Sequence, residues 1–167
     1  MTRSTTLITP LTAAQRRIGG HIVWGLSNSE IAVQVHLTLE TVRSHISTMR
    51  LRLHCPPRAS RAVLAHTLLR LQQVPPPELT LRHSFVPDAE ERQLIHALAK
   101  HSPRGDIARA AGIPTGALRT RTDGLVRQAG AANVPHLIGL AHTHRILGSG
   151  ESTIAVPPPN GPLGAAR

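Results

Sequence analysis

The chain has 167 residues, of which 40% are apolar and only Trp24 and Phe85 are aromatic, a composition that favours helical cores of Leu, Ile, Val and Ala. A single cysteine, Cys55, excludes an intramolecular disulfide and a cysteine-based zinc site, and no segment approaches the roughly 18 apolar residues of a membrane span. The formal charge of +10 predicts attraction to a polyanion, and it is concentrated in residues 1–83, which hold 10 Arg against 3 acidic residues.

The first half of the chain predicts a flexible arm at residues 1–9 and four helices, at about 12–24, 28–35, 39–53 and 58–71. Ser27 or Asn28 is expected to cap the second helix, and Thr38 the third. The third helix has its buried positions at spacings of four, three and four, at Val42, Ile46, Met49 and Leu53. A short helix, a tight turn and a longer amphipathic helix are the elements with which a protein places one helix in a DNA groove.

Pro75, Pro76 and Pro77 interrupt the helical pattern, and residues 72–86 are predicted to form a stiff, largely extended linker. Four further helices are expected at about 88–100, 104–111, 115–128 and 133–147, followed by a disordered tail at 148–167. The second set repeats the first at a displacement of 76 residues, since Ile31-Ala32 falls on Ile107-Ala108 and Val42-Arg43 on Leu118-Arg119. The alternative is a chance similarity between two Arg-rich helical stretches.

The first half resembles the LuxR-type (GerE-like) helix-turn-helix family of bacterial transcription regulators. The similarity extends over about residues 10–70. It rests on Leu11-Thr12, on Gly25-Leu26-Ser27-Asn28 with Glu30-Ile31-Ala32, on Thr41-Val42-Arg43 with His45, and on Arg58-Ala59. The resemblance and the 76-residue repeat together predict an all-α fold of two tandem four-helix domains, at 10–71 and, as a degenerate copy, at 87–147. Gly19-Gly20 departs from the family pattern and is expected to loosen the first helix.

DNA contacts are predicted mainly on the helix at 39–53. Arg43 can donate two hydrogen bonds to guanine O6 and N7, and Ser44 and Ser47 lie on the same face. By resemblance, backbone contacts fall to Thr41, His45 and Arg50. Ser27, Asn28 and Thr38 can offer polar groups to phosphates at the helix starts, although plain capping explains Ser27 and Thr38 equally well.

The matching face of the second domain holds Arg119, Thr120, Arg121, Asp123 and Arg127. DNA phosphates repel the carboxylate of Asp123 unless it accepts a hydrogen bond from a cytosine amino group. This helix is therefore either unusually selective or no longer a DNA-binding element, and the sequence leaves both possibilities open.

The fourth helices are predicted to form an interface. In the family this helix commonly pairs two subunits, and the apolar positions Val63, Leu68 and Leu71 have counterparts around Leu137 and Leu140. Pairing within one chain would give a monomer that imitates a dimer. There are two alternatives to this internal pairing: two chains form a homodimer through the first domain, or both apolar faces belong to ordinary cores.

These features predict a cytoplasmic, nucleoid-associated bacterial regulator that binds double-stranded DNA, with no cofactor and no enzymatic activity. His136, His142 and His144 do not share a helix face and have no acidic or cysteine partner nearby, which argues against a metal site. A helical adaptor whose second domain binds another regulator or RNA polymerase is the alternative. A third possibility, nonspecific nucleoid or RNA binding, depends on charge alone.

Overall fold

The computed structural model describes residues 9–78 and 84–148. Most of the predicted arm at 1–9 and tail at 148–167, and residues 79–83 of the predicted linker, lie outside these ranges. Within the described residues the chain forms eight α-helices, one short 3-10 helix and no strand. The predicted all-α fold class is therefore confirmed.

All eight predicted helices are present. The first half contains α1 (Ala13–Val23), α2 (Asn28–Val35), α3 (Leu39–Arg52) and α4 (Arg61–Arg70). The second half contains α5 (Ala89–Lys100), α6 (Arg104–Ala111), the 3-10 helix η1 (Thr115–Ala117), α7 (Leu118–Gln128) and α8 (Val134–Thr143). Three ends were placed wrongly from the sequence. Helix α4 begins at Arg61 rather than near 58, α7 begins at Leu118, after η1, rather than near 115, and α8 ends at Thr143 rather than near 147.

Local hydrogen bonds explain most helix boundaries. Ser27 and Thr38, which the sequence suggested as N-caps, each accept a hydrogen bond from a backbone N–H of the first turn, and so do Asp88 of α5 and Asn133 of α8. The start of α4 is fixed by Ser60, whose hydroxyl accepts from the N–H of Val63, while Arg58 adopts a left-handed φ of 60° that no helix contains. At the end of α8, Arg145 has a left-handed φ of 57° that terminates the helix.

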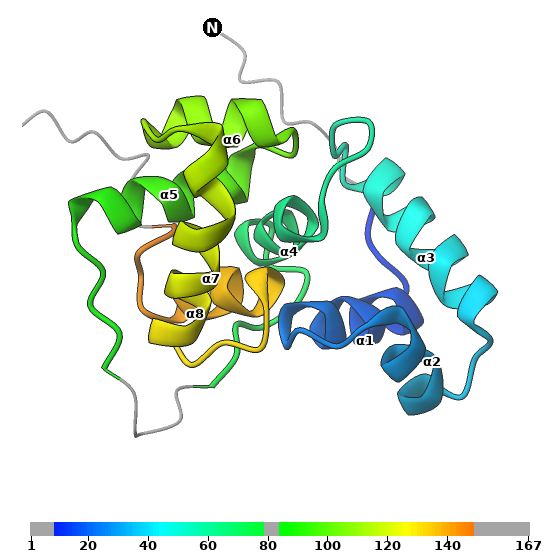
Figure 1. The fold of residues 1–167 in the computed structure, drawn as a ribbon. Helices are drawn as coiled ribbons and strands as arrows, with labels where there is room; N and C mark the ends of the chain where they lie inside the picture. Colours follow the sequence, from blue (N-terminus) through cyan, green and yellow to red (C-terminus); the bar gives the residue numbers. More distant parts are fainter. Residues whose placement is uncertain (1–8, 79–83, 149–167) are drawn as a thin grey trace, which may run out of the picture.

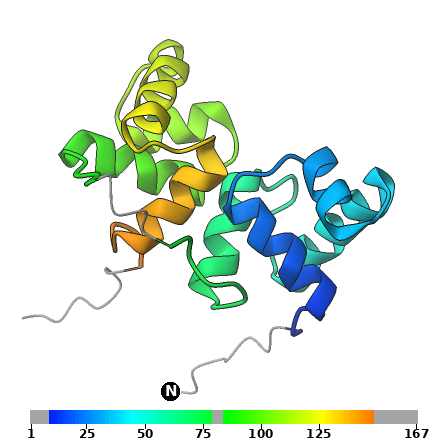
Figure 2. The ribbon, with the colours of Figure 1, turned by 90° about the horizontal axis from the view of Figure 1, so that it is seen from below.

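Helices α1–α3 gather on one side of the molecule and α5–α7 on the other, with α4 and α8 packed together between them (Figures 1 and 2). The buried apolar residues form one continuous cluster that includes Ile18 and Met49 of the first half and Ile95 and Leu137 of the second. The two halves therefore share one hydrophobic core and are not separate domains joined by a flexible linker.

The backbones of the two halves approach closely at Gly139. A Cβ at this position of α8 would lie 2.8 Å from Cγ of Pro77 and 3.0 Å from the carbonyl oxygen of Val23, at the end of α1. Gly19 has a similar role within α1, because a Cβ there would lie 3.2 Å from the side chains of Leu68 and Val74. Gly19 lies within a continuous α1, and the absence of a side chain there permits this close packing.

The described parts of the predicted linker are packed against the helices. Val74, Pro77 and Phe85 are buried, and the hydroxyl of Thr143 donates a 2.7 Å hydrogen bond to the carbonyl oxygen of Pro77. This segment is thus part of the shared core, which a spacing argument based on three prolines does not reveal.

Candidate DNA interface

Helices α2 and α3 form a helix-turn-helix. The turn is His36, Leu37 and Thr38, in which His36 ends α2 in a left-handed conformation with φ 56° and Thr38 caps α3. The hydroxyl of Thr38 accepts from the N–H of Thr41 at 3.1 Å and lies 2.8 Å from the Thr41 hydroxyl. Capping therefore positions the first turn of α3.

The two faces of α3 differ sharply in exposure. Val42, Ile46 and Met49 are buried against α1 and α2, as their spacing predicted. Arg43, Ser44 and Ser47 are exposed on the opposite face. In both ribbon views α3 lies at the edge of the molecule, away from α5–α7 (Figures 1 and 2). The structure thus brings the three predicted base-contacting residues together on one outward surface.

This surface carries net positive charge, because Glu40 is the one carboxylate beside Arg43, Arg50 and Arg52 on α3. Arg43 lies 3.8 Å from Glu40 in an ion pair whose side chains are 59% and 83% exposed, so water screens it strongly. His45 and Arg50 are half-buried, and Nε of Arg50 is buried without a hydrogen-bond partner among the described residues. Arg52 is oriented inward, donating to the carbonyl oxygen of Pro10 and to Oε1 of Gln15.

The start of α2 is less open to phosphate than the sequence suggested. Ser27 and Glu30 form a capping box, in which the Ser27 N–H donates to the Glu30 carboxylate at 2.7 Å. These bonds to Ser27 lower the pKa of Glu30 below its usual range. The amide oxygen of Asn28 accepts from the guanidinium of Arg61. Both side chains therefore have partners within the protein.

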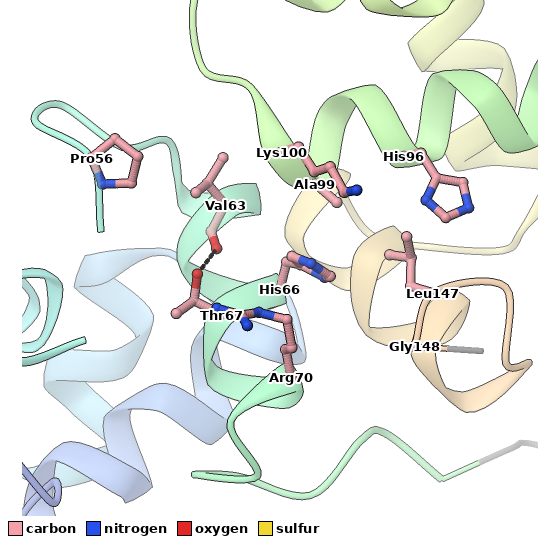
Figure 3. Close-up of a pocket in the computed structure, with 10 residues that line it drawn as sticks. All are labelled: Pro56, Val63, His66, Thr67, Arg70, His96, Ala99, Lys100, Leu147 and Gly148. Carbon is pink, nitrogen blue, oxygen red and sulfur yellow. Dashed lines mark hydrogen bonds between the residues drawn. The ribbon is translucent and has the colours of Figure 1, made fainter. Parts of the chain in front are cut away.

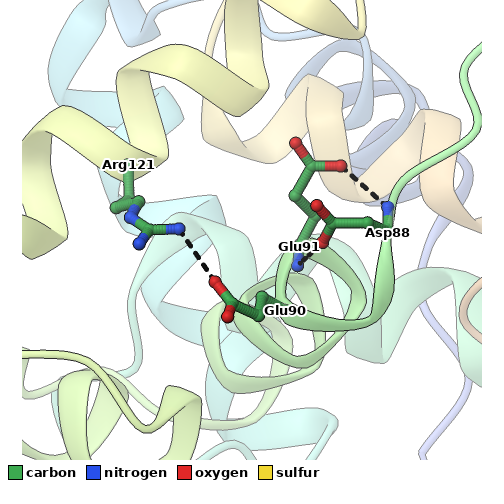
Figure 4. A network of polar contacts seen from close by, with 4 residues as sticks. All are labelled: Asp88, Glu90, Glu91 and Arg121. Atoms are coloured by element: carbon green, nitrogen blue, oxygen red, sulfur yellow. Dashed lines mark hydrogen bonds and ion pairs between the residues drawn. The ribbon is translucent and has the colours of Figure 1, made fainter.

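On the corresponding face of α7, two of the three arginines are paired with carboxylates. Arg121 donates to Glu90 of α5 at 3.1 Å (Figure 4), and Arg119 lies 3.7 Å from Asp123. Nε of Arg127 donates to the carbonyl oxygen of Asp123 at 3.4 Å. Thr120 is exposed beside them. These pairs are as exposed as that of Arg43 with Glu40, but two carboxylates, Asp123 and Glu90, lie beside the arginines of α7, so its charge is more balanced than that of α3.

The predicted interface residues lie where α4 packs along α8. Val63, Leu68 and Leu137 are buried, and Leu71 and Leu140 are half-buried against the core. Within the same contact, Nδ1 of His66 and Nε2 of His142 form a 2.9 Å hydrogen bond. Figure 3 shows His66 beside a pocket of about 400 Å³ that Arg70, His96 and Lys100 also line.

The histidines predicted not to bind metal have other contacts. His136 accepts a hydrogen bond from the N–H of Ala132, and the ring of His144 packs edge-on against Phe85. Among the described residues no group of three potential metal ligands comes together. None of the described helices is long and apolar enough to cross a membrane.

Arg61 was not singled out from the sequence. Its guanidinium donates to the carbonyl oxygen of Leu26 at 2.6 Å as well as to Asn28, so it ties the start of α4 to the turn before α2. Asn28 lies 33 positions and Leu26 lies 35 positions before Arg61 in the chain. Local sequence patterns give no signal for contacts over such separations.

A capped helix-turn-helix with an exposed polar second helix defines the class of DNA-binding helix-turn-helix domains. Residues 9–66 match the family model described as "Bacterial regulatory proteins, luxR family" (GerE). The match confirms a LuxR-family helix-turn-helix domain at residues 9–66, as the resemblance predicted, in a family described as bacterial regulatory proteins. No curated protein and no solved structure matches the chain.

Proposed function

We propose that the protein is a sequence-specific regulator of transcription that inserts α3 into the major groove of double-stranded DNA. The principal support is the exposed row of Arg43, Ser44 and Ser47 on a helix whose opposite face is buried. Arg43 supplies a bidentate donor for guanine, and the two hydroxyls can bond to either type of base pair. Thr41, His45, Arg50 and Thr38 lie along the flanks of the same helix and serve as backbone contacts.

We further propose that the second half is a degenerate copy of the same domain. The first residues of α2 and α6 are 76 positions apart, and so are their last residues. The left-handed residues that follow them, His36 and Gly112, have the same separation. Thr12 and Asp88 form equivalent capping boxes at the starts of α1 and α5. The contact of α4 with α8 then makes the chain a monomer with the organisation of a dimer.

A second candidate role, an adaptor that binds a regulator or RNA polymerase through its second half, is favoured by one observation. Two of the three arginines of α7, Arg119 and Arg121, are paired with Asp123 and Glu90, so this face offers less charge to phosphates than α3 does. In this arrangement α3 binds DNA and α7 contacts a protein.

Selection of bound sequences from random duplexes by the full chain tests the proposal. The expected result is an enriched motif that includes a guanine and that Arg43→Ala protein no longer selects. Sequences without any enriched motif would instead indicate nonspecific binding through charge. The adaptor role predicts a motif of one half-site only, whereas DNA contact by both halves predicts two unlike half-sites.

A further inference from the structure

A second cavity, of about 700 Å³, lies where the two halves meet. The residues of α3 that are proposed to contact DNA do not line it. Its walls are mainly apolar, formed by Leu26 and Ala62 of the first half and by Leu98, Ile107, Val134 and Pro135 of the second. Small-molecule sites typically have volumes of about 300 to 1,000 Å³ and walls of this kind, with a few polar groups that orient the ligand.

The charged group in this wall is Arg61, at the start of α4. Its half-buried guanidinium uses two donors, to the Leu26 carbonyl and to Asn28, and both acceptors are neutral. Its other N–H groups bond to none of the described residues, and no described carboxylate lies within ion-pair distance of it. Burial and the charge of Arg50 lower the pKa of Arg61. The cavity thus contains a cation without a counterion.

We propose that this cavity binds a small molecule with an apolar body and a single carboxylate. The carboxylate pairs with the open donors of Arg61, where a planar fork of N–H groups matches two oxygens. The body lies against Leu98, Ile107 and Val134. An organic cation would be repelled by Arg61, and a small inorganic anion would leave the apolar walls in contact with water.

The site has contributions from both halves of the molecule. Ser27 and Asn28, at the start of α2, belong to the same wall, and Asn28 shares Arg61 with the expected carboxylate. A ligand that contacts both halves stabilises their packed arrangement, because it binds the folded protein and not the unfolded chain. Binding should therefore raise the melting temperature.

Octanoate is a suitable first probe, with octanol and octylammonium as partners of equal chain length. We expect the full chain to bind octanoate at least tenfold more tightly than either partner, as measured by calorimetry. Backbone amide resonances of Ser27, Leu98 and Ile107 should shift in the NMR spectrum. Equal affinities for octanoate and octanol, no binding at millimolar octanoate, or shifts confined to other surfaces would overturn the proposal.

Two variants and one control complete the test. Val134→Trp places a large side chain in the cavity while retaining Arg61, and should reduce octanoate affinity at least tenfold. Arg61→Met should abolish the preference for octanoate over octanol. Arg70→Met, an exposed position on the same helix, should bind as the parent does. Circular dichroism verifies folding. If Arg61→Met does not fold, Val134→Trp alone decides, and its unchanged affinity would refute the site.

Discussion

The planar guanidinium of Arg43 lies on the exposed face of α3. Arg43→Ala should weaken binding to the preferred sequence by about 1 to 3 kcal/mol and binding to random duplex by much less, since a bidentate base contact depends on sequence. The exposed pair with Glu40 contributes little to this difference. Titrations with both duplexes measure it, and Arg43→Lys retains the charge as a control. Equal losses on both duplexes would identify Arg43 as a phosphate contact.

His66 and His142 make the folded protein sensitive to acid. Burial lowers the pKa of both from 6.5 to about 4, and neighbouring positive charges, including Arg70 and Lys100, contribute for His66. Between about pH 4 and 6.5 the unfolded chain therefore binds protons that the folded protein does not, and the free energy of unfolding rises with pH. Stability should fall as pH decreases from about 7 toward 4.

Urea unfolding at several pH values measures this dependence. His142→Gln should flatten the decline, because it removes one titrating group and reduces the positive charge near His66 on acidification. Other histidines with lowered pKa, such as His21 and His96, contribute the same background slope to both proteins. The same slope in parent and variant would contradict the assignment to this pair.

At the scale of elements, the contact of α8 with α1 depends on Gly139. Gly139→Ala should destabilise the protein by about 1 to 3 kcal/mol, because the added Cβ would lie 3.0 Å from the Val23 carbonyl oxygen, which cannot move without shifting α1. Gly20→Ala is the matched control, since a Cβ there has nothing within 4 Å, and a gain of about 0.5 to 1 kcal/mol is expected. Denaturant midpoints compare them, and a neutral Gly139→Ala would refute close packing.

The two helices α3 and α7 should differ in their contribution to the salt dependence of DNA binding. Replacing Arg50 of α3 with Gln should lower the slope of log affinity against log salt by about 0.9, the value for one neutralised phosphate. The corresponding change of Arg121, which is paired with Glu90, should leave the slope unchanged. Affinity titrations over a range of salt concentrations test this. An equal decrease for Arg121→Gln would place α7 on DNA and exclude the adaptor role for that face.

Elements were predictable from sequence where local chemistry determines them. The caps Ser27, Thr38, Asp88 and Asn133 lie beside the residues that they bond, so their positions are visible in the sequence. The start of α4 was not, because the predicted start near residue 58 falls on Arg58, whose left-handed conformation delays the helix to Arg61. The bond of Asn28 to Arg61 and the close approach at Gly139 depend on tertiary packing, which spacing rules do not contain.

At the scale of the whole molecule, the exposed face of α3 was predictable from the sequence, whereas part of the core shared by the two halves was not. The spacing of four, three and four between the apolar residues of α3 predicted which residues face outward, and Arg43, Ser44 and Ser47 are exposed as expected. The burial of Pro77 and Phe85 was not predicted, because a Pro-rich segment has the same composition whether it is packed or solvated.

The packing of α8 over α4 predicts the oligomeric state of the protein. Leu64 and Leu68 are fully buried, and α8 of the same chain covers the helix that a family-like dimer would use. The protein should therefore be monomeric in solution and should bind one chain per site, on DNA with unlike halves. Native mass spectrometry of the free and DNA-bound protein determines both stoichiometries, and footprinting shows the symmetry of the site.

A polar substitution in this contact separates the two modes of assembly. Leu68→Asp should lower the melting temperature of a monomer, because it places a carboxylate in the shared core of the two halves. Exposed Arg70, two residues further along α4, provides the control position, where Arg70→Asp should have little effect on stability. A parent protein that is dimeric on a palindrome, and a Leu68→Asp variant that becomes a folded monomer with unchanged helicity, would show that α4 pairs between chains instead.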